Sequence, residues 1–461
     1  MHKLFHDIVL LRHEGAEEVQ MLKRKILSEL EAWKNSENKK CIMIRGPRQV
    51  GKTYIVRCLG KEYESFIEIN FYESPELKNI FAGNLDVNTM LLNMSALISG
   101  IELIPGKTLI LLDEIQECPE AVTSLKFWYS DNRFDVIATG SSLGIEYKNS
   151  ISYPVGSVET KVMYSLDFEE FLWANNVEEN VIEYIRNCFT NREAVSYAIH
   201  ERMMRLLREY MTVGGMPAIV SEYILNNNMS EVDRLQRQIY SDYMNDIAHY
   251  APPEVKIKAE KCYRSIANQL SKENHKFQYK TVEEKGSAQR FESSIDWLTS
   301  SYLAAAVYNI STVDFPIEAY REEDNFRIYP TDIGLLMASY PFVLKAALRN
   351  DNTMETPAQN IMIRTAKGGL YEALAADMLI KRGYENLFFL KDAKSTREIE
   401  FFITNDDGII PVEIKAGRSK ANSLGRLLEN ELIPYGYKLA SQNVGVNGKR
   451  ITLPLYMLMF L

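Results

Sequence analysis

The segment Gly46-Pro47-Arg48-Gln49-Val50-Gly51-Lys52-Thr53 constrains the fold of this chain more than any other feature. It follows the apolar run CIMIR, typical of a buried strand, and precedes TYIVRCLG, typical of a helix. Its glycines let the backbone wrap closely, so that N–H groups and the start of the helix point at negative charge. This pattern predicts a loop that binds the phosphates of ATP. The residues expected to contact the nucleotide are Gly46, Pro47, Arg48, Gln49, Val50, Gly51, Lys52, Thr53 and Tyr54.

The end of this loop and a later strand together predict a site for nucleotide hydrolysis. Lys52 is expected to reach the β- and γ-phosphates, and the hydroxyl of Thr53 is expected to bind Mg²⁺. The apolar run LILL at residues 109–112 ends in Asp113 and Glu114. Asp113 is expected to hold Mg²⁺ and Glu114 to polarise the attacking water. An apolar run ending in two acids is common, but its place two strands after the phosphate loop makes it specific.

Five short apolar runs alternate with helical stretches between residues 40 and 165. The runs are CIMIR, FIEINF, TLILLD, FDVIAT and VETKVMY. Strands that alternate with helices predict a mostly parallel sheet with helices on both faces. Ser141 follows the fourth run, where its hydroxyl is placed to bond the γ-phosphate or the attacking water. An ordinary turn with a helix N-cap explains Ser141 almost equally well.

Composition limits the class of protein. The length of 461 residues predicts several domains. The net charge of −9 argues against a chain that is a polyanion binder as a whole, although a local basic surface remains compatible with it. Five scattered cysteines fit a reducing, cytoplasmic environment. No apolar run is long enough to span a membrane, and the tail ITLPLYMLMFL is expected to form a buried final strand.

The pattern of apolar residues divides the chain into five segments. Residues 14–34 are expected to form an amphipathic helix, and residues 341–365 are expected to be irregular. The predicted segments are an N-terminal helical extension at residues 1–39, a P-loop ATPase core at 40–165, a helical lid at 166–253, a winged-helix-like module at 254–345, and a nuclease-like α/β domain at 346–461.

The motifs GPRQVGKT, LILLDEIQ, ATGSS, LDFEEF and GGMP resemble those of a bacterial and archaeal family of AAA+-type ATPases. The resemblance covers most of the chain. It implies a P-loop sheet in the strand order 5-1-4-3-2, a helical lid, a winged helix and a C-terminal domain of the restriction-endonuclease-like type. The cellular role of that family is poorly defined, so the resemblance implies the domains of the protein more than its cellular function.

A basic segment lies in the predicted winged helix. Residues 254–290 contain nine Lys or Arg against five acids. Residues 287–300 form the candidate recognition helix, and the basic side chains placed to contact DNA phosphates are Lys276, Lys280, Lys285 and Arg290. The alternative is that the module packs on the ATPase and that these residues are its solvated face.

The C-terminal segment carries acids in a pattern known from metal-dependent nucleases. Glu400 lies on one predicted strand, and Glu413 and Lys415 lie on the next. Glu400 and Glu413 are expected to hold Mg²⁺, with Lys415 beside the scissile phosphate and Glu372 as a further ligand. Glu400 stands where such sites usually have Asp, and its extra methylene can loosen Mg²⁺ geometry. The alternative is a hairpin with solvated charges.

These observations predict a slow, Mg²⁺-dependent ATPase in which Lys52, Glu114 and Ser141 act in catalysis. Its cycle is expected to control nucleic-acid binding by the winged-helix and nuclease-like domains. The alternative is an ATP-gated switch that binds DNA or a protein partner and has an inactive C-terminal domain. An oligomer is compatible with either prediction, because we find no convincing arginine finger in the chain.

Overall fold

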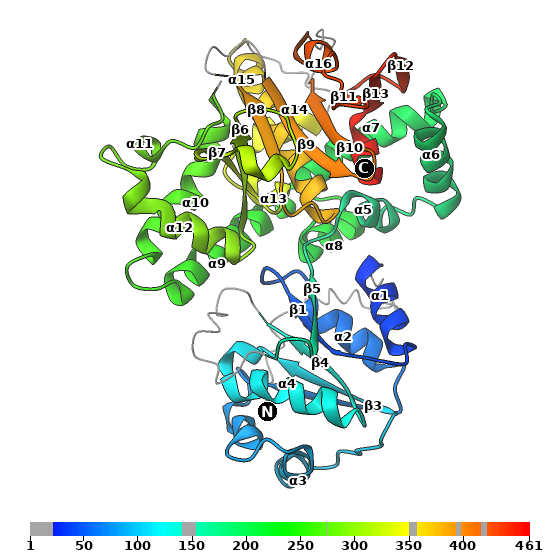
Figure 1. Cartoon of the computed structure of the whole chain (residues 1–461), viewed down its shortest axis with the longest axis vertical. Coiled ribbons are helices and arrows are strands. Elements are labelled where there is room, and N and C mark those ends of the chain that lie inside the picture. Colours follow the sequence, from blue (N-terminus) through cyan, green and yellow to red (C-terminus); the bar gives the residue numbers. More distant parts are fainter. Residues whose placement is uncertain (1–21, 141–153, 273, 350–356, 393–397, 416–421) are drawn as a thin grey trace. The chain divides into compact units, whose positions relative to one another are not determined.

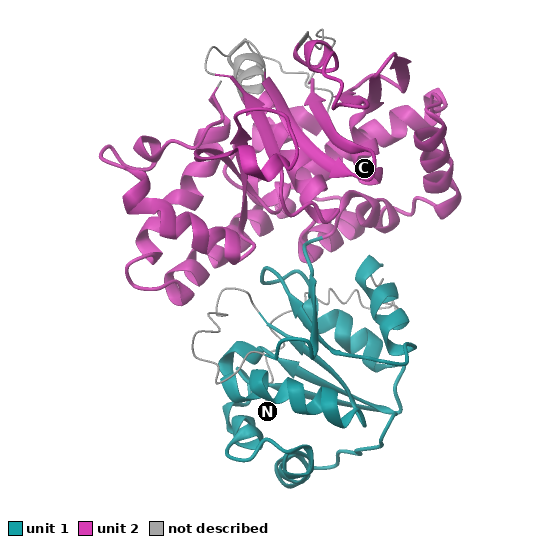
Figure 2. Ribbon diagram, viewed as in Figure 1, with its two compact units in different colours: residues 1–165 teal, residues 166–461 magenta. Residues whose placement is uncertain are grey.

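The computed structural model describes the chain except for residues 1–21, 141–153, 273, 350–356, 393–397 and 416–421. The described chain forms two compact units, Met1–Ser165 and Leu166–Leu461 (Figure 2). In the described residues, no helix combines the length and the apolar composition that crossing a membrane requires.

Unit 1 is built on a five-stranded parallel sheet (Figure 1). Its strands are β1 (Cys41–Arg45), β2 (Ser65–Asn70), β3 (Thr108–Asp113), β4 (Asp135–Thr139) and β5 (Val158–Val162). They lie in the order β2-β3-β4-β1-β5, which confirms the predicted order 5-1-4-3-2. β1 and β3 are almost wholly buried, as expected for runs of Ile, Leu and Met in the middle of a sheet with helices on both faces.

Helices cover both faces of this sheet. The elements are α1 (Lys25–Lys34), α2 (Lys52–Gly60), η1 (Pro75–Phe81), α3 (Val87–Leu97), η2 (Ile115–Glu117) and α4 (Pro119–Asp131). α3 and α4 pack on one face in a core that includes Met43, Ile110 and Trp128. α2 packs on β3 and β4, and α1 packs on α2. The expected helix over residues 14–34 is wrong at residues 22–24, which are not helical; residues 14–21 lie outside the described residues.

Unit 2 begins with helices. These are α5 (Phe168–Ala174), α6 (Glu179–Asn191), α7 (Tyr197–Val213), α8 (Pro217–Asn226), α9 (Met229–Tyr250), α10 (Lys256–Leu270), α11 (Tyr279–Val282) and α12 (Ala288–Ser300). The motif LDFEEF starts α5 because Asp167 and Glu170 form a reciprocal capping box. The predicted helical character of residues 166–250 is confirmed.

The second half of unit 2 forms one eight-stranded sheet in the order β12-β13-β11-β10-β9-β8-β6-β7. Its strands are β6 (Ala304–Ile310), β7 (Arg321–Pro330), β8 (Phe388–Lys391), β9 (Glu398–Asn405), β10 (Gly408–Ile414), β11 (Gly436–Ala440), β12 (Gly445–Asn447) and β13 (Arg450–Pro454). The antiparallel pair β6–β7 joins the later strands through a parallel pairing of β6 with β8. The predicted boundary at residue 345 therefore falls between strands of one sheet.

Further helices accompany this sheet, and two expectations are wrong there. The elements are η5 (Ile317–Tyr320), α13 (Ile333–Met337), α14 (Phe342–Arg349), α15 (Pro357–Lys381), α16 (Asn422–Leu427) and η6 (Leu455–Phe460). Residues 341–365, expected to be irregular, contain α14 and the start of α15, because proline fits the beginning of a helix. The tail is a strand only to Pro454 and then turns into the buried 3-10 helix η6.

Candidate functional site

The loop between β1 and α2 has a backbone that only glycine can provide at Gly46. Gly46 has a φ of +143°, and a Cβ there would lie 2.0 Å from the carbonyl oxygen of Met163. Gly51 has a φ of +96° and immediately precedes the first residue of α2. Position 46 therefore excludes a side chain, and position 51 has a backbone conformation that residues with a side chain rarely adopt. The loop ends at the N-terminus of a helix, where N–H groups favour an anion.

The two residues at the start of α2 point into this loop and toward β3. Lys52 is 8% exposed, and its Nζ donates to the carbonyl oxygens of Gly46 (3.1 Å) and Pro47 (2.7 Å). The hydroxyl of Thr53 donates to both carboxylate oxygens of Asp113, at 3.0 and 3.1 Å. The structure thus brings together the cation, the hydroxyl and the acid that the sequence predicts as one site.

Asp113 is held by side chains from three other segments. Besides Thr53, its carboxylate accepts a hydrogen bond from Asn70 Nδ2 at 3.0 Å and one from Thr139 Oγ1. Burial raises the pKa of Asp113 to about 6, helped by the charge of Glu114 and opposed by the hydrogen bonds from Thr139 and Thr53. Asn70 and Thr139 end β2 and β4, so the carboxyl edge of the parallel sheet converges on Asp113.

Of the other predicted catalytic residues, the structure describes Glu114 but not Ser141. Glu114 adopts a left-handed backbone with φ 52°, and its carboxylate accepts a hydrogen bond from the side chain of Gln116. Ser141 lies outside the described residues. The predicted roles of Lys52, Glu114 and Ser141 in catalysis remain predictions.

Arg24 supports the loop and was missed by sequence analysis. Its buried guanidinium donates from Nη1 to the carbonyl oxygen of Val50 at 2.9 Å and from Nη2 to that of Tyr164 at 2.6 Å. Arg24 lies within the helix predicted over residues 14–34, where an arginine is usually a solvated residue, so the sequence carries no signal for this contact.

The residues of this site fit ATP and Mg²⁺. A loop that ends at a helix N-terminus and a buried ammonium suit a triphosphate, and a hydroxyl with a carboxylate supplies the hard oxygen ligands that Mg²⁺ prefers. In the described residues, no group of three or more His, Cys, Asp or Glu side chains is placed to hold a metal ion.

The C-terminal acids form a separate cluster in unit 2, where the carboxylate of Glu372 is engaged by other side chains of the protein. Arg327 Nη1 lies 2.5 Å from Glu372 Oε1, Tyr329 donates to the same oxygen, and His275 Nδ1 lies 2.6 Å from Oε2. Burial alone would raise the pKa of Glu372, but Arg327 and His275 outweigh burial and lower the pKa to about 2. Arg327 also lies 2.5 Å from Glu398 Oε1. Glu372 is thus an ion-pair partner inside the fold.

Glu400, Glu413 and Lys415 lie together, as predicted. Lys415 Nζ is 3.1 Å from Glu413 and 3.8 Å from Glu400, and the N–H of Ile414 donates to Glu400 at 3.0 Å. Burial raises the pKa of Glu400 to about 8 despite the opposing charge of Lys415. The Oε2 atom of Glu413 is buried without a hydrogen-bond partner in the structure. The predicted metal role of these acids remains a prediction.

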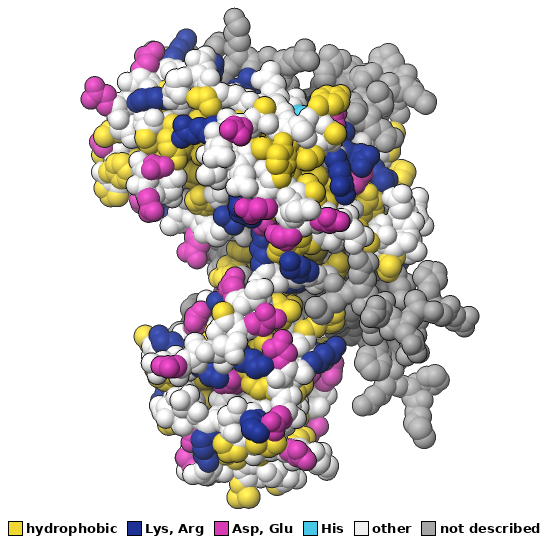
Figure 3. Space-filling model, turned by 90° about the vertical axis from the view of Figure 1, so that its right-hand side faces the viewer, with side chains coloured by type: hydrophobic (Ala, Val, Ile, Leu, Met, Phe, Trp, Pro, Cys, Tyr) yellow, Lys and Arg dark blue, Asp and Glu magenta, His cyan; other side chains and the backbone are white. Residues whose placement is uncertain are grey.

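The predicted recognition helix α12 does not present a basic face. Its exposed side chains include Arg290, Glu292 and Asp296. Arg290 and Lys261 both pair with Glu283. The face on the right-hand side of Figure 1, away from α12, has Lys and Arg side chains interspersed with Asp and Glu (Figure 3). A DNA contact in this module would therefore depend on Lys276, Lys280 and Lys285 rather than on α12.

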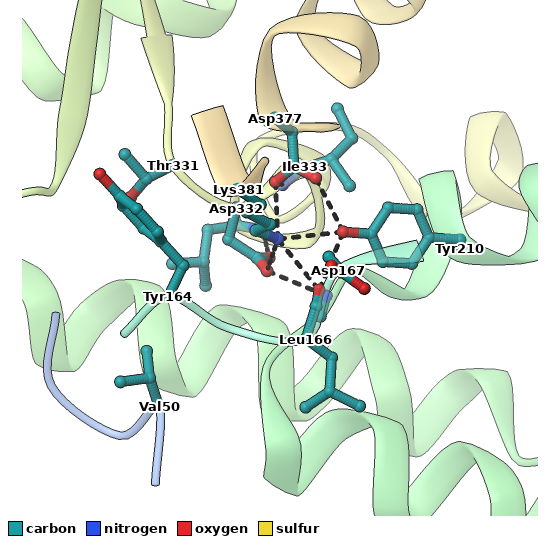
Figure 4. Close-up of polar contacts among 12 residues, drawn as sticks. Val50, Tyr164, Leu166, Asp167, Tyr210, Thr331, Asp332, Ile333, Asp377 and Lys381 are labelled. Atoms are coloured by element: carbon teal, nitrogen blue, oxygen red, sulfur yellow. Dashed lines mark hydrogen bonds and ion pairs between the residues drawn. The ribbon is translucent and has the colours of Figure 1, made fainter. Parts of the chain in front are cut away.

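A second buried ion cluster joins several of the motifs quoted above (Figure 4). Lys381 Nζ lies 2.8 Å from Asp377 and 3.5 Å from Asp332, and it donates to Tyr210 Oη at 3.0 Å. Tyr210 in turn donates to Asp377 and to the carbonyl oxygen of Leu166. Burial lowers the pKa of Lys381, but Asp377 and Asp332 more than offset it, so the pKa is raised. This cluster is a structural link between α7, α15 and the start of unit 2.

The fold and loop of unit 1 define a P-loop ATPase domain of the AAA type. Residues 38–172 match the AAA domain family. Residues 204–345 and 367–454 match two families that are each described as a domain of unknown function, DUF8612 and DUF4143.

Individual relatives are distant. The uncharacterized protein MJ1637 of Methanocaldococcus jannaschii is 26% identical over 215 residues, which cover 45% of this chain and 44% of that protein. Similar solved structures include the Walker-type ATPase PABY2304 of Pyrococcus abyssi, with 13% identity, a TM-score of 0.42 and coverage of 69% of this chain and 96% of that chain. Another is the ORC1 protein of Aeropyrum pernix in complex with DNA, with 12% identity, a TM-score of 0.27 and coverage of 70% and 92%.

Proposed function

We propose that this chain is a slow, Mg²⁺-dependent ATP hydrolase whose nucleotide cycle controls the activity of unit 2. The observation that carries this proposal is the direct contact of Thr53 with Asp113 at the end of a loop that already holds Lys52. A hydroxyl and a carboxylate beside a phosphate-binding loop are the two protein ligands that a nucleotide-bound Mg²⁺ needs.

Each residue has a distinct part in this proposal. The N–H groups of the loop bind the phosphate oxygens, and Lys52 neutralises the β- and γ-phosphates. Thr53 and Asp113 hold the Mg²⁺ ion, which withdraws charge from the phosphate oxygens when bound. Glu114 orients the attacking water. Its left-handed backbone directly after β3 presents this side chain at the carboxyl edge of the sheet.

Two variants test the ATPase proposal. Lys52→Ala should abolish binding of Mg·ATP in isothermal titration calorimetry, whereas Glu114→Gln should bind Mg·ATP and lose phosphate release. Lys61→Ala changes an exposed lysine of the same unit and should match the wild type in both assays. Normal Mg·ATP binding by Lys52→Ala would contradict the proposal.

We further propose that unit 2 binds nucleic acid without cleaving it. Support for binding comes from the basic residues Lys280 and Lys285. Support for the lack of cleavage comes from the C-terminal cluster, where Glu372, a predicted metal ligand, is already paired with the buried Arg327. Displacing Arg327 to admit a metal ion would leave a buried charge unpaired, which is costly.

Two assays test this second proposal. Fluorescence anisotropy with a labelled DNA duplex should show affinity that falls with salt and weakens in the double variant Lys280→Glu, Lys285→Glu. A supercoiled plasmid incubated with Mg²⁺ or Mn²⁺ should remain intact. Nicking that disappears in Glu413→Ala and Lys415→Ala would instead establish a nuclease. If neither the duplex nor the plasmid is bound at any salt concentration, unit 2 would be left as a protein-binding module.

A further inference from the structure

We propose that Asn70 is a positioning residue that holds Asp113 in the orientation needed to bind Mg²⁺. This inference rests on the proposed ATPase function and concerns a residue of the run FIEINF that has no part in the predicted site. It is carried by the geometry at the carboxyl ends of β2 and β3.

The position of Asn70 is set by strand pairing. In the parallel register of β2 and β3, Asn70 lies opposite Asp113, and the N–H of Phe71 donates to the carbonyl oxygen of Asp113 at 3.1 Å. The side chains of two paired residues lie on the same face of a sheet, and from there Asn70 Nδ2 donates to Asp113 Oδ2 at 3.0 Å. The backbone and the side chain of Asp113 are thus both tied to the end of β2.

The amide of Asn70 is locked in one orientation. Its Oδ1 atom accepts the N–H groups of Tyr72 (3.0 Å) and Glu73 (2.9 Å) in the turn that follows β2. Because the carbonyl side of the amide is occupied by two donors, the NH₂ group must face Asp113. The turn therefore fixes the orientation of the Asn70 amide, and the amide fixes the orientation of the Asp113 carboxylate.

The other donors to Asp113 do not replace Asn70. Thr139 donates to Oδ1, whereas Asn70 donates to Oδ2. Thr53 contacts both oxygens, but its hydroxyl is itself a Mg²⁺ ligand in the proposed function. Among the described side chains, Asn70 and Thr139 are therefore the two that can hold Asp113 while Thr53 serves the metal.

The test separates metal binding from nucleotide binding. Affinity for a fluorescent N-methylanthraniloyl-ATP is measured first in EDTA and then across a Mg²⁺ titration, with ATP turnover measured in parallel. Asn70→Ala should bind this probe in EDTA as the wild type does, but should need about tenfold more Mg²⁺ for half of the metal-dependent gain in affinity. Turnover should fall by a similar factor.

Two further variants keep the result interpretable. Asn70→Ser keeps an oxygen that can accept the N–H groups of the turn but is too short to reach Asp113, so it should fold normally and show the same Mg²⁺ shift. Asn93→Ala removes another asparagine of unit 1, whose Nδ2 donates to the carbonyl oxygen of Ile80, and should titrate Mg²⁺ like the wild type.

The inference and the proposed function fail in different ways. A wild-type protein that binds no probe at any Mg²⁺ concentration would refute the ATPase function. A wild type that responds to Mg²⁺, together with Asn70→Ala and Asn70→Ser variants that respond at the same concentration, would overturn the role of Asn70 alone. Equal loss of probe affinity with and without Mg²⁺ would also overturn it, because Asn70 would then act on the loop as a whole.

Discussion

At the scale of single residues, the guanidinium of Arg24 fixes the path of the phosphate loop. It donates to Val50 within the loop and to Tyr164 just after β5. A planar fork of N–H donors is suited to bridging two carbonyl groups in this way. A loop that is held at Val50 from outside can keep its path before a phosphate arrives.

We predict that Arg24→Ala destabilises the protein and weakens nucleotide binding. Two carbonyl groups lose a donor, which should cost roughly 2 to 4 kcal/mol in the free energy of unfolding measured with urea. Arg133→Ala is the matched control, because Arg133 is 39% exposed and pairs with Asp131 on the surface. Equal unfolding midpoints for the two variants would contradict this role of Arg24.

Sequence reasoning identified Lys52, Thr53 and Asp113, because a motif fixes their spacing and chemistry. It missed Asn70, Arg24 and Thr139, whose roles arise from tertiary contacts between distant segments. For Asn70 a signal existed: it ends a predicted strand of a parallel sheet, and the carboxyl ends of such strands meet at one edge. For Arg24 no comparable signal is present in the sequence.

At the scale of elements, β7 and α15 are joined through buried charges. Arg327 on β7 is fully buried, pairs with Glu372 on α15 and lies 4.1 Å from the centre of the Phe389 ring. Removing one member of a buried ion pair is costly because it leaves the other charge unpaired. The packing of the long helix on the sheet thus depends on the charge of Glu372.

This dependence predicts a loss of stability in acid. The pKa of Glu372 is lowered to about 2 from an ordinary value of 4.5, so its contribution is present above pH 4.5 and is lost as the pH falls toward 2. By about pH 4 the wild type should have lost roughly 1 kcal/mol from this group. Urea unfolding between about pH 6 and about pH 4 should therefore show a shallower pH dependence for Glu372→Gln than for the wild type.

An exposed acid provides the comparison. Glu385→Gln changes a carboxylate on the surface just beyond α15 and should keep the pH dependence of the wild type. If Glu372→Gln loses stability with pH as steeply as Glu385→Gln does, the buried pair does not control the acid response.

Most elements followed from local patterns, and the exceptions have physical causes. The five strands of unit 1 and the hairpin β9–β10 were predicted because their apolar runs end at clear turns. α14 was missed because proline was read as a break, although Pro341 directly precedes the helix. The tail was misread because a short apolar run does not distinguish a strand from a buried helix.

At the scale of the whole molecule, the eight-stranded sheet makes the later part of unit 2 one folding unit. β6 pairs with β8, and Arg327 and Tyr329 on β7 reach Glu372 on α15. We predict that a fragment of residues 166–461 is soluble and melts cooperatively, whereas a fragment of residues 346–461 aggregates, because it exposes the edge of β8. Circular dichroism and size-exclusion chromatography provide the measurement.

The outcome for the shorter fragment is decisive. A monomeric fragment of residues 346–461 with a cooperative melting transition would show that the C-terminal strands fold without β6 and β7. The sequence could not reveal this pairing, because β6 and β8 are separated by helices and the register of a parallel pair leaves no local trace.

The shared sheet also constrains how the two segments of unit 2 can evolve. The two segments that match separate families of unknown function, residues 204–345 and 367–454, contribute neighbouring strands to it. A gene that acquired one segment alone would encode a protein with an uncovered backbone edge and an arginine without its acid. Selection should therefore keep the two segments in a single reading frame and let them change only in step with each other.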